Sequence, residues 1–164
     1  MLSRKVLQEL TAYLEKHYVL ELACFCEPAC IKLDRSFSMA DDSGLGKLIS
    51  QLDAGFSETL LTLIDRTGKK DSEIYKKANV DRKLFSKIRN NPDYKPSKTT
   101  AIAFAIALEL DLEETKDFIA RAGFALSRSS KFDVIIEYFI KQKIYDVFEI
   151  NEALFAFDQS LLGA

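Results

Sequence analysis

The sequence predicts an all-α protein, and three observations support this fold class. From about residue 44 onward, apolar residues recur at helical spacing and nowhere alternate as in a strand. Residues that cap helices precede most of these apolar stripes, and glycine or proline follows them. The chain has 164 residues, which is enough for one good core, or for one domain with an appendage.

The first 43 residues differ from the rest of the chain. We expect a helix over about residues 3–17 and then a segment of mixed strand and loop character, YVLELACFCEPACIKLDRSFSMADDSG. A boundary between residues 36 and 44 divides the chain into an N-terminal appendage (1–43), a helical domain (44–125) and a C-terminal helical extension (126–164).

Two apolar stripes open the helical domain. The first stops near Gly55 and the second at Gly68, as expected of a residue that ends helices without strain. The first consists of Leu45, Leu48, Ile49 and Leu52, and the second of Phe56, Leu60, Leu63 and Ile64.

Two short helices joined at Asn79-Val80 are predicted next. Asp71 is expected to cap the first helix and Asp81 the second. The sharp turn between them favours a positive φ, which asparagine tolerates next best after glycine, and Val80 would fill the angle between the helices. The residues expected to face inward are Ile74 and Ala78, then Leu84, Phe85 and Ile88.

Later helix starts are marked by prolines and caps. Pro92 and Pro96 enforce a loop. The helices after it open at Ser97, at the capping pair Asp111 and Glu114, and at the capping pair Ser130 and Asp133, with a stop at Gly123 between the two pairs. The helix that follows residue 130 is apolar nearly all round, so it needs cover from this chain or from a partner. A last helix is expected over about residues 147–157.

Charge is distributed unevenly along a chain of net charge −2. Residues 66–98 hold eleven Lys or Arg against four acids, a net of +7, whereas residues 1–65 and 99–164 have nets of −4 and −5. A polyanion responds to this local field and not to the global charge. A charge run taken alone is more often a solvated face.

The order of motifs points to a known family. An apolar first helix is followed by SEIYKKANVDRKLFSKIRNN, by the loop PDYKPS, and by TTAIAFAIALELDLEET with a fifth helix. Residues 57 to about 122 therefore resemble the lambda repressor/Cro-like (XRE-type) helix-turn-helix family. The resemblance implies a five-helix repressor-like domain, to which this chain adds two C-terminal helices and the N-terminal appendage. The segment through FDQSLLGA looks like an extension found in bacterial proteins that attach such a module to other domains.

The resemblance implies a DNA-binding transcriptional regulator whose recognition helix, about residues 81–91, lies in the major groove. Matching motif positions assigns base readout to Arg82, Lys83, Ser86 and Lys87, and the cations among them favour guanine O6 and N7. The expected contacts to the DNA backbone are Lys76, Lys77, Arg89, Asn90, Tyr94, Lys95 and Lys98. One such module covers half a site, so a homodimer is expected, with residues 130–157 as the candidate contact.

Three positions depart from the family pattern. Tyr75 stands where alanine is usual, Asn79 where glycine is usual, and Asp71 where a phosphate-contacting glutamine is frequent. The bulk of Tyr75 would splay the helix pair or point outward, and the charge of Asp71 would repel a phosphate. Asn79 is a benign change. Asp71 and Tyr75, with the acidic remainder of the chain and the apolar C-terminal helices, favour an alternative: a protein-interaction module that keeps the fold without binding DNA and docks an acidic protein partner through the basic helix.

Other chemistry has little support in the sequence. His17, Cys24, Cys26 and Cys30 fall within fourteen residues, but the cysteine spacing departs from that of common zinc sites, so we expect free or buried thiols and no cofactor. No Ser/His/Asp or Cys/His set indicates an enzyme. No apolar run reaches the ~18 residues that span a membrane. Three cysteines, an odd number within seven residues, do not make a disulfide framework, so we expect a protein of the reducing cytoplasm.

Overall fold

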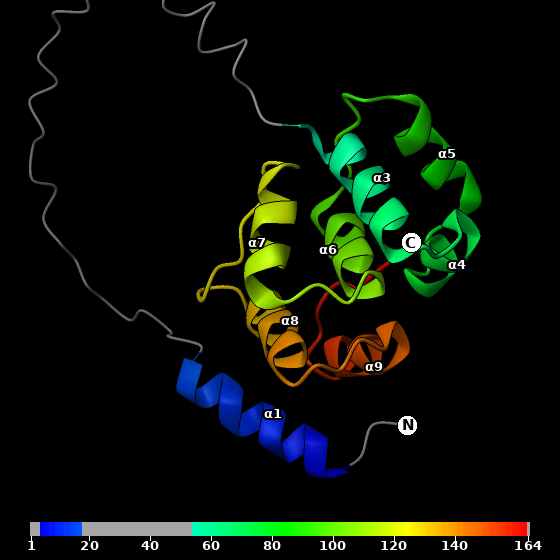
Figure 1. The fold of residues 1–164 in the computed structure, drawn as a ribbon. Helices are drawn as coiled ribbons and strands as arrows, with labels where there is room; N and C mark the ends of the chain where they lie inside the picture. Colours follow the sequence, from blue (N-terminus) through cyan, green and yellow to red (C-terminus); the bar gives the residue numbers. More distant parts are fainter. Residues whose placement is uncertain (1–3, 18–53, 164) are drawn as a thin grey trace, which may run out of the picture. The chain divides into compact units, whose positions relative to one another are not determined.

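The structure is a computed structural model that describes residues 4–17 and 54–163. Every regular element within these ranges is a helix, which confirms the all-α prediction for this part of the chain (Figure 1). The helices are α1 (Arg4–His17), α3 (Phe56–Thr67), α4 (Asp71–Lys77), α5 (Arg82–Asn90), α6 (Lys98–Ala107), α7 (Leu112–Ala120), α8 (Lys131–Lys141) and α9 (Val147–Ala156). The helix predicted over residues 45–52 and the segment after residue 17 lie outside the described residues.

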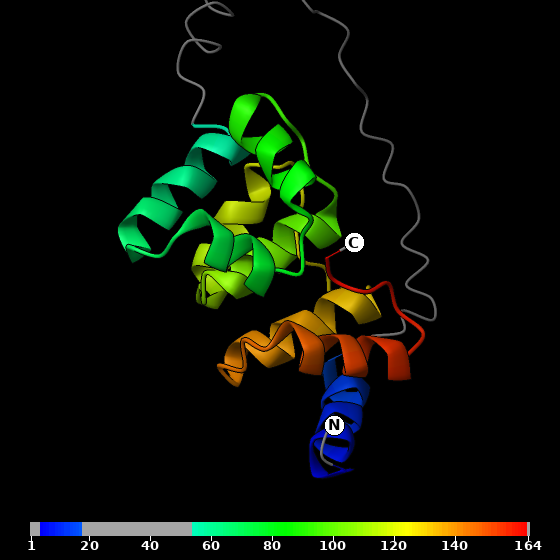
Figure 2. The same ribbon diagram turned by 90° about the vertical axis from the view of Figure 1, so that its right-hand side faces the viewer.

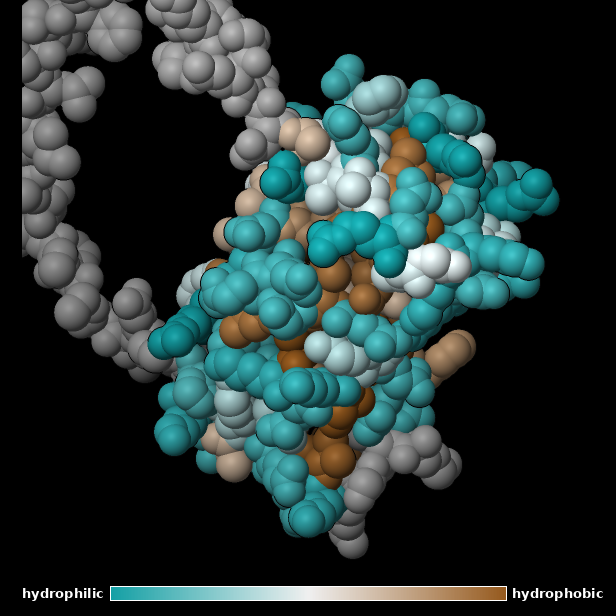
Figure 3. Space-filling model, viewed as in Figure 1, coloured by the Kyte–Doolittle hydropathy of each residue, from teal (hydrophilic) through white to brown (hydrophobic). Residues whose placement is uncertain are grey.

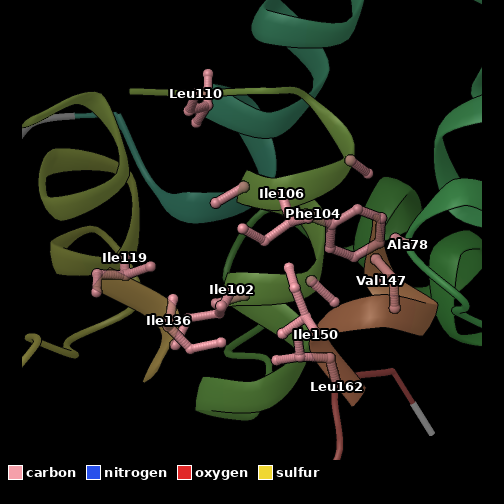
Figure 4. Packing of buried hydrophobic residues seen from close by; sticks show 14 of the residues in the cluster. Ala78, Ile102, Phe104, Ile106, Leu110, Ile119, Ile136, Val147, Ile150 and Leu162 are labelled. Carbon is pink, nitrogen blue, oxygen red and sulfur yellow. The ribbon is translucent and has the colours of Figure 1, made fainter. Parts of the chain in front are cut away.

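Helix α6 forms the centre of the hydrophobic core. Its residues from Thr100 to Ala107 are all buried, and α4, α7 and α9 pack against it. Phe104 of α6 belongs to the same buried cluster as Ala78, at the end of α4, and Ile150 of α9 (Figure 4). A helix that is apolar all round is stable only when neighbours cover its sides. The buried contacts with α6 therefore hold α4 in place.

Most of the predicted helix ends agree with the structure. The Ser97 side chain accepts a hydrogen bond from the N–H of Thr100 at 3.2 Å, and Asp111 and Glu114 form a complete capping box. Gly68 follows α3 with φ 66, in the left-handed region that ends helices.

The capping pair predicted for Ser130 and Asp133 forms only in part. The Ser130 side chain accepts a hydrogen bond from the N–H of Asp133 at 3.3 Å. The Asp133 carboxylate instead accepts hydrogen bonds from Lys98 Nζ at 2.6 Å and from the N–H of Ser127 at 2.9 Å. The Asp133 side chain is only 1% exposed, so this ion pair connects the starts of α6 and α8 through a buried carboxylate.

The cover that α8 needs is supplied within the chain. Helices α1, α7 and α9 all pack against it, and Figure 2 shows α8 and α9 side by side. The Tyr13 ring of α1 meets Tyr138 of α8 edge-on, with ring centroids 5.1 Å apart, and Leu10 is fully buried. The predicted appendage thus contributes a helix to the core that α8 shares, while the predicted domain boundaries remain predictions.

No helix in the described ranges combines the length and the apolarity needed to cross a bilayer.

We predict that Lys98→Met lowers the free energy of unfolding by about 2 kcal/mol, because it leaves the buried Asp133 carboxylate without its cation. This magnitude is below that of a fully buried pair because the Lys98 side chain is 30% exposed. Urea denaturation monitored by circular dichroism measures the change.

The matched control is Lys116→Met, which breaks the exposed pair of Lys116 with Glu113 on α7 and should change the stability by less than about 0.5 kcal/mol. Equal losses in the two variants would contradict the structural role of the buried pair.

Candidate nucleic-acid interface

A tight turn joins α4 to α5. Asn79 adopts φ 53, in the left-handed region, as predicted for a residue that stands in for glycine. The N–H of Val80 donates to the carbonyl oxygen of Tyr75 at 2.9 Å, and the Val80 side chain is buried in the angle between the helices. Helices α4 and α5 pack against each other across this turn, so their outer side chains share one surface.

The prediction that Asp71 caps α4 is wrong. Lys70 precedes the helix, and Asp71 is its first residue. The Asp71 carboxylate accepts a hydrogen bond from the Arg89 guanidinium on α5. This ion pair bridges the two helices and offsets the negative charge that would otherwise repel a phosphate. Asp81 precedes α5 as predicted, without a side-chain capping bond.

Helix α5 has two chemically distinct sides. Phe85 and Ile88 are buried, as predicted, and Leu84 is half-buried. We define the basic face as four of the exposed side chains of α5, namely Arg82, Lys83, Ser86 and Lys87. In Figure 3, hydrophilic side chains project from the region where Figure 1 places α5. The recognition residues implied by the family resemblance are thus brought together on one exposed surface.

Four cations of the basic segment 66–98 are paired with acids. The pairs are Lys77 and Lys69 with Glu109, Arg89 with Asp71, and Lys98 with Asp133. The hydrogen bond from Lys77 and the positive charge beside it hold the pKa of Glu109 below its ordinary value of 4.5, so this carboxylate is ionised at neutral pH. Among the described residues, no carboxylate forms an ion pair with Arg82, Lys83 or Lys87. The positive charge of the basic face is therefore not offset there.

Helix α5 stands as a ridge between two surface hollows. The larger hollow, about 570 Å³, lies toward α4, and the smaller one, about 440 Å³, lies toward the loop after α5. Ser86 lines both hollows, which places it on the crest between them. The larger hollow is lined by Lys69, Lys70, Asp71, Ser72, Tyr75, Arg82, Phe85, Ser86 and Arg89, and the smaller by Ser86, Lys87, Asn90, Asn91 and Tyr94.

Tyr75 does not separate the two helices. Its half-buried ring lies 5.5 Å from the Phe85 ring, centroid to centroid, and α4 and α5 remain in contact. The side chain also lines the larger hollow. The bulky residue at this position therefore packs across the helix pair and supplies an aromatic surface to the hollow.

The remaining predicted contact residues fall into two groups. Lys76, Asn90 and Lys95 are exposed and Tyr94 is half-buried, whereas Lys77, Arg89 and Lys98 are engaged in the ion pairs described above. The sequence interpretation omitted Lys70, which is exposed and lines the larger hollow. The position of Lys70 within the basic segment 66–98 could have identified it as a candidate contact. It also missed Glu109, because nothing in the sequence pairs this residue with Lys77, 32 positions away.

Of the candidate zinc residues, only His17 lies in the part of the chain that the structure describes. His17 ends α1, where its ring lies 4.2 Å from that of Tyr13, and Cys24, Cys26 and Cys30 lie outside the described residues. Within the described ranges, no group of three His, Cys, Asp or Glu side chains is placed to hold a metal ion.

Comparison with known proteins found no matching family model, curated protein or solved structure. The resemblance to the repressor-like family therefore rests on the motifs of this chain alone.

We predict that Glu109→Gln raises the salt concentration at which the protein elutes from a heparin column, because it releases Lys69, which precedes α4, and Lys77, which ends it. The matched control is Glu113→Gln, which changes the net charge equally and releases Lys116 on α7. If both variants elute at the same salt concentration, the polyanion does not bind near α4 and α5.

Proposed function

We propose that the protein binds double-stranded DNA through the basic face and acts as a transcriptional regulator. In this proposal α4 and α5 form the helix-turn-helix of a repressor-like domain, and α5 is the recognition helix. The observation that carries the proposal is the division of α5, whose apolar side is buried while Arg82, Lys83 and Lys87 are exposed and pair with no carboxylate in the described ranges. Uncompensated cations on one exposed helix attract a polyanion.

The shape around α5 supports a duplex as the ligand. A major groove about 12 Å wide admits a helix of about 10–12 Å diameter. The hollows on both sides of α5 leave room for the two phosphate ridges that border such a groove. Each hollow contains a tyrosine, Tyr75 or Tyr94, whose hydroxyl is a suitable donor to a phosphate oxygen.

The side chains divide into two roles. Arg82, Lys83, Ser86 and Lys87 lie along the exposed side of α5 and are assigned to base edges, with guanine favoured by the cations. Phosphate contacts are assigned to three other exposed lysines: Lys70 before α4, Lys76 on α4 and Lys95 in the loop after α5. The other predicted phosphate contacts, Lys77, Arg89 and Lys98, share their charge with acids and contribute less per residue.

We predict that Arg82→Ala combined with Lys87→Ala weakens binding to a duplex selected from genomic fragments by about 1–3 kcal/mol for each base contact removed, and that it also lowers the slope of log affinity against log salt, since two cations are removed from the DNA-binding surface. Fluorescence anisotropy at several salt concentrations measures both quantities.

The matched control removes one lysine and one arginine elsewhere, through Lys116→Ala combined with Arg128→Ala. Both residues are exposed, on α7 and on the loop before α8. The proposal is wrong if the two double variants lose affinity and salt slope to the same extent, or if neither differs from the wild type.

We also propose that the regulator is a homodimer that uses the exposed side of α9. Within residues 130–157, the apolar residues of α8 are covered by the chain itself. Phe148 and Phe155, in contrast, are 75% and 76% exposed. They are seven positions apart, which places them on one helix face, so two antiparallel copies of α9 would pair each Phe148 with the partner's Phe155.

We predict that Phe155→Asp shifts sedimentation of the protein from dimer to monomer. Ala156→Asp is the control, because it places the same charge on the neighbouring exposed position of α9. Identical sedimentation of the two variants would exclude this contact.

The exposed phenylalanines also support the alternative function, a protein-interaction module that does not bind DNA. A monomeric wild type that shows no retardation of any DNA at low salt, together with a stable protein partner lost on Phe155→Asp, would decide in favour of this alternative.

A further inference from the structure

The segment after α9 returns to the turn between α4 and α5. Figures 1 and 2 both show the red C-terminal segment running back from α9 to the green helices. The Asn79 side-chain amide donates a hydrogen bond to the carbonyl oxygen of Gly163 at 3.3 Å, across 84 positions of sequence. The turn that sets the direction of α5 is thus in contact with the far end of the described chain.

Leu162 is anchored to α9 by a pair of hydrogen bonds. Its N–H donates to Asn151 Oδ1 at 2.8 Å, and its carbonyl oxygen accepts from Asn151 Nδ2 at 3.1 Å. The Leu162 side chain is fully buried and belongs to the same cluster as Ala78 and Val147 (Figure 4). Both backbone groups and the side chain are therefore held, which fixes this residue in place.

Gly163 makes direct backbone contact with the turn. A Cβ at this position would lie 2.5 Å from the carbonyl oxygens of Ala78 and Asn79, which is closer than Cβ atoms come to non-bonded atoms in proteins. Gly163 also has φ 66, which disfavours every side chain. Only glycine fits here without displacing the turn.

These contacts give a reason for asparagine at position 79. Glycine would adopt the positive φ of this turn as readily, but it has no side chain to reach Gly163. Asparagine both makes the turn and holds the segment that packs on it.

We propose that residues 159–163 form a latch that positions α5 for reading DNA. This inference rests on the proposed function. The latch lies against the carbonyl groups of Ala78 and Asn79, in the turn that sets the direction of α5. Asn79, Leu162 and Gly163 are positioning residues, since they reach DNA only through the helix that they orient. Sequence discrimination depends on the orientation of α5, whereas charge-driven non-specific binding does not.

The test is the full-length Gly163→Ala variant, with Ser160→Ala as the control at an exposed position of the same segment. Affinity for the selected duplex and for a scrambled duplex is measured at 10 °C, after circular dichroism has shown both variants to be folded. We expect Gly163→Ala to lose about fivefold or more in affinity for the selected duplex, the equivalent of one base contact, and less than twofold for the scrambled one.

Asn79→Gly is a milder variant that keeps the turn and removes only the side-chain bond to the latch. It should also lower the ratio of the affinity for the selected duplex to that for the scrambled duplex, but by a smaller factor than Gly163→Ala. It serves as the test if Gly163→Ala does not fold. The latch proposal is wrong if the folded variants keep the wild-type ratio of these two affinities. It is also wrong if they lose affinity equally for both duplexes.

A second readout separates the latch from the proposed function. The amide NMR signals of residues 84–90 are recorded without DNA, since these residues lie beyond the turn that the latch contacts. Displaced signals in Gly163→Ala but not in Ser160→Ala support the latch even if the wild type binds no duplex, in which case the proposed function alone fails. Unchanged signals overturn the latch.

Discussion

The left-handed turn at Asn79 is the constraint on which the rest of the surface depends. It changes the direction of the chain between α4 and α5, so that the two helices pack together and present their outer sides as one surface. Three contacts hold this turn in place. Val80 is buried between α4 and α5, Ala78 is buried in the core centred on α6, and Gly163 lies against the carbonyl groups of Ala78 and Asn79. A side chain on α5 can read a ligand only if this geometry is fixed beforehand.

Ion pairs reduce the number of cations in residues 66–98 that are free to bind a ligand. Eleven cations lie within residues 66–98, but Glu109, Asp71 and Asp133 engage four of them. These pairs have different consequences. Asp133 is a buried carboxylate whose charge needs its lysine, whereas the pairs of Glu109 and Asp71 lie at the surface, where an ion pair contributes little to stability. In the described part of the chain, the three cations of the basic face on α5 pair with no carboxylate, which favours α5 as the proposed ligand-binding surface.

The sequence was most informative where a local rule sets the structure. The positive φ of Asn79, the capping box of Asp111 with Glu114 and the amphipathic division of α5 each depend on neighbouring residues, and each prediction is confirmed. Asp71 was misassigned because its partner, Arg89, lies 18 positions away in another helix. Glu109 and Gly163 could not be assigned for the same reason, since their partners are brought near only by tertiary packing.

The central claim is that α5 carries the ligand-binding surface and that the ligand is duplex DNA. The most direct measurement is a titration of the isotopically labelled protein with a short duplex, monitored by amide NMR signals. The account predicts salt-dependent shifts concentrated in residues 70–95, with α1 and α7 unaffected. Shifts confined to α9, or none at low salt, would contradict it.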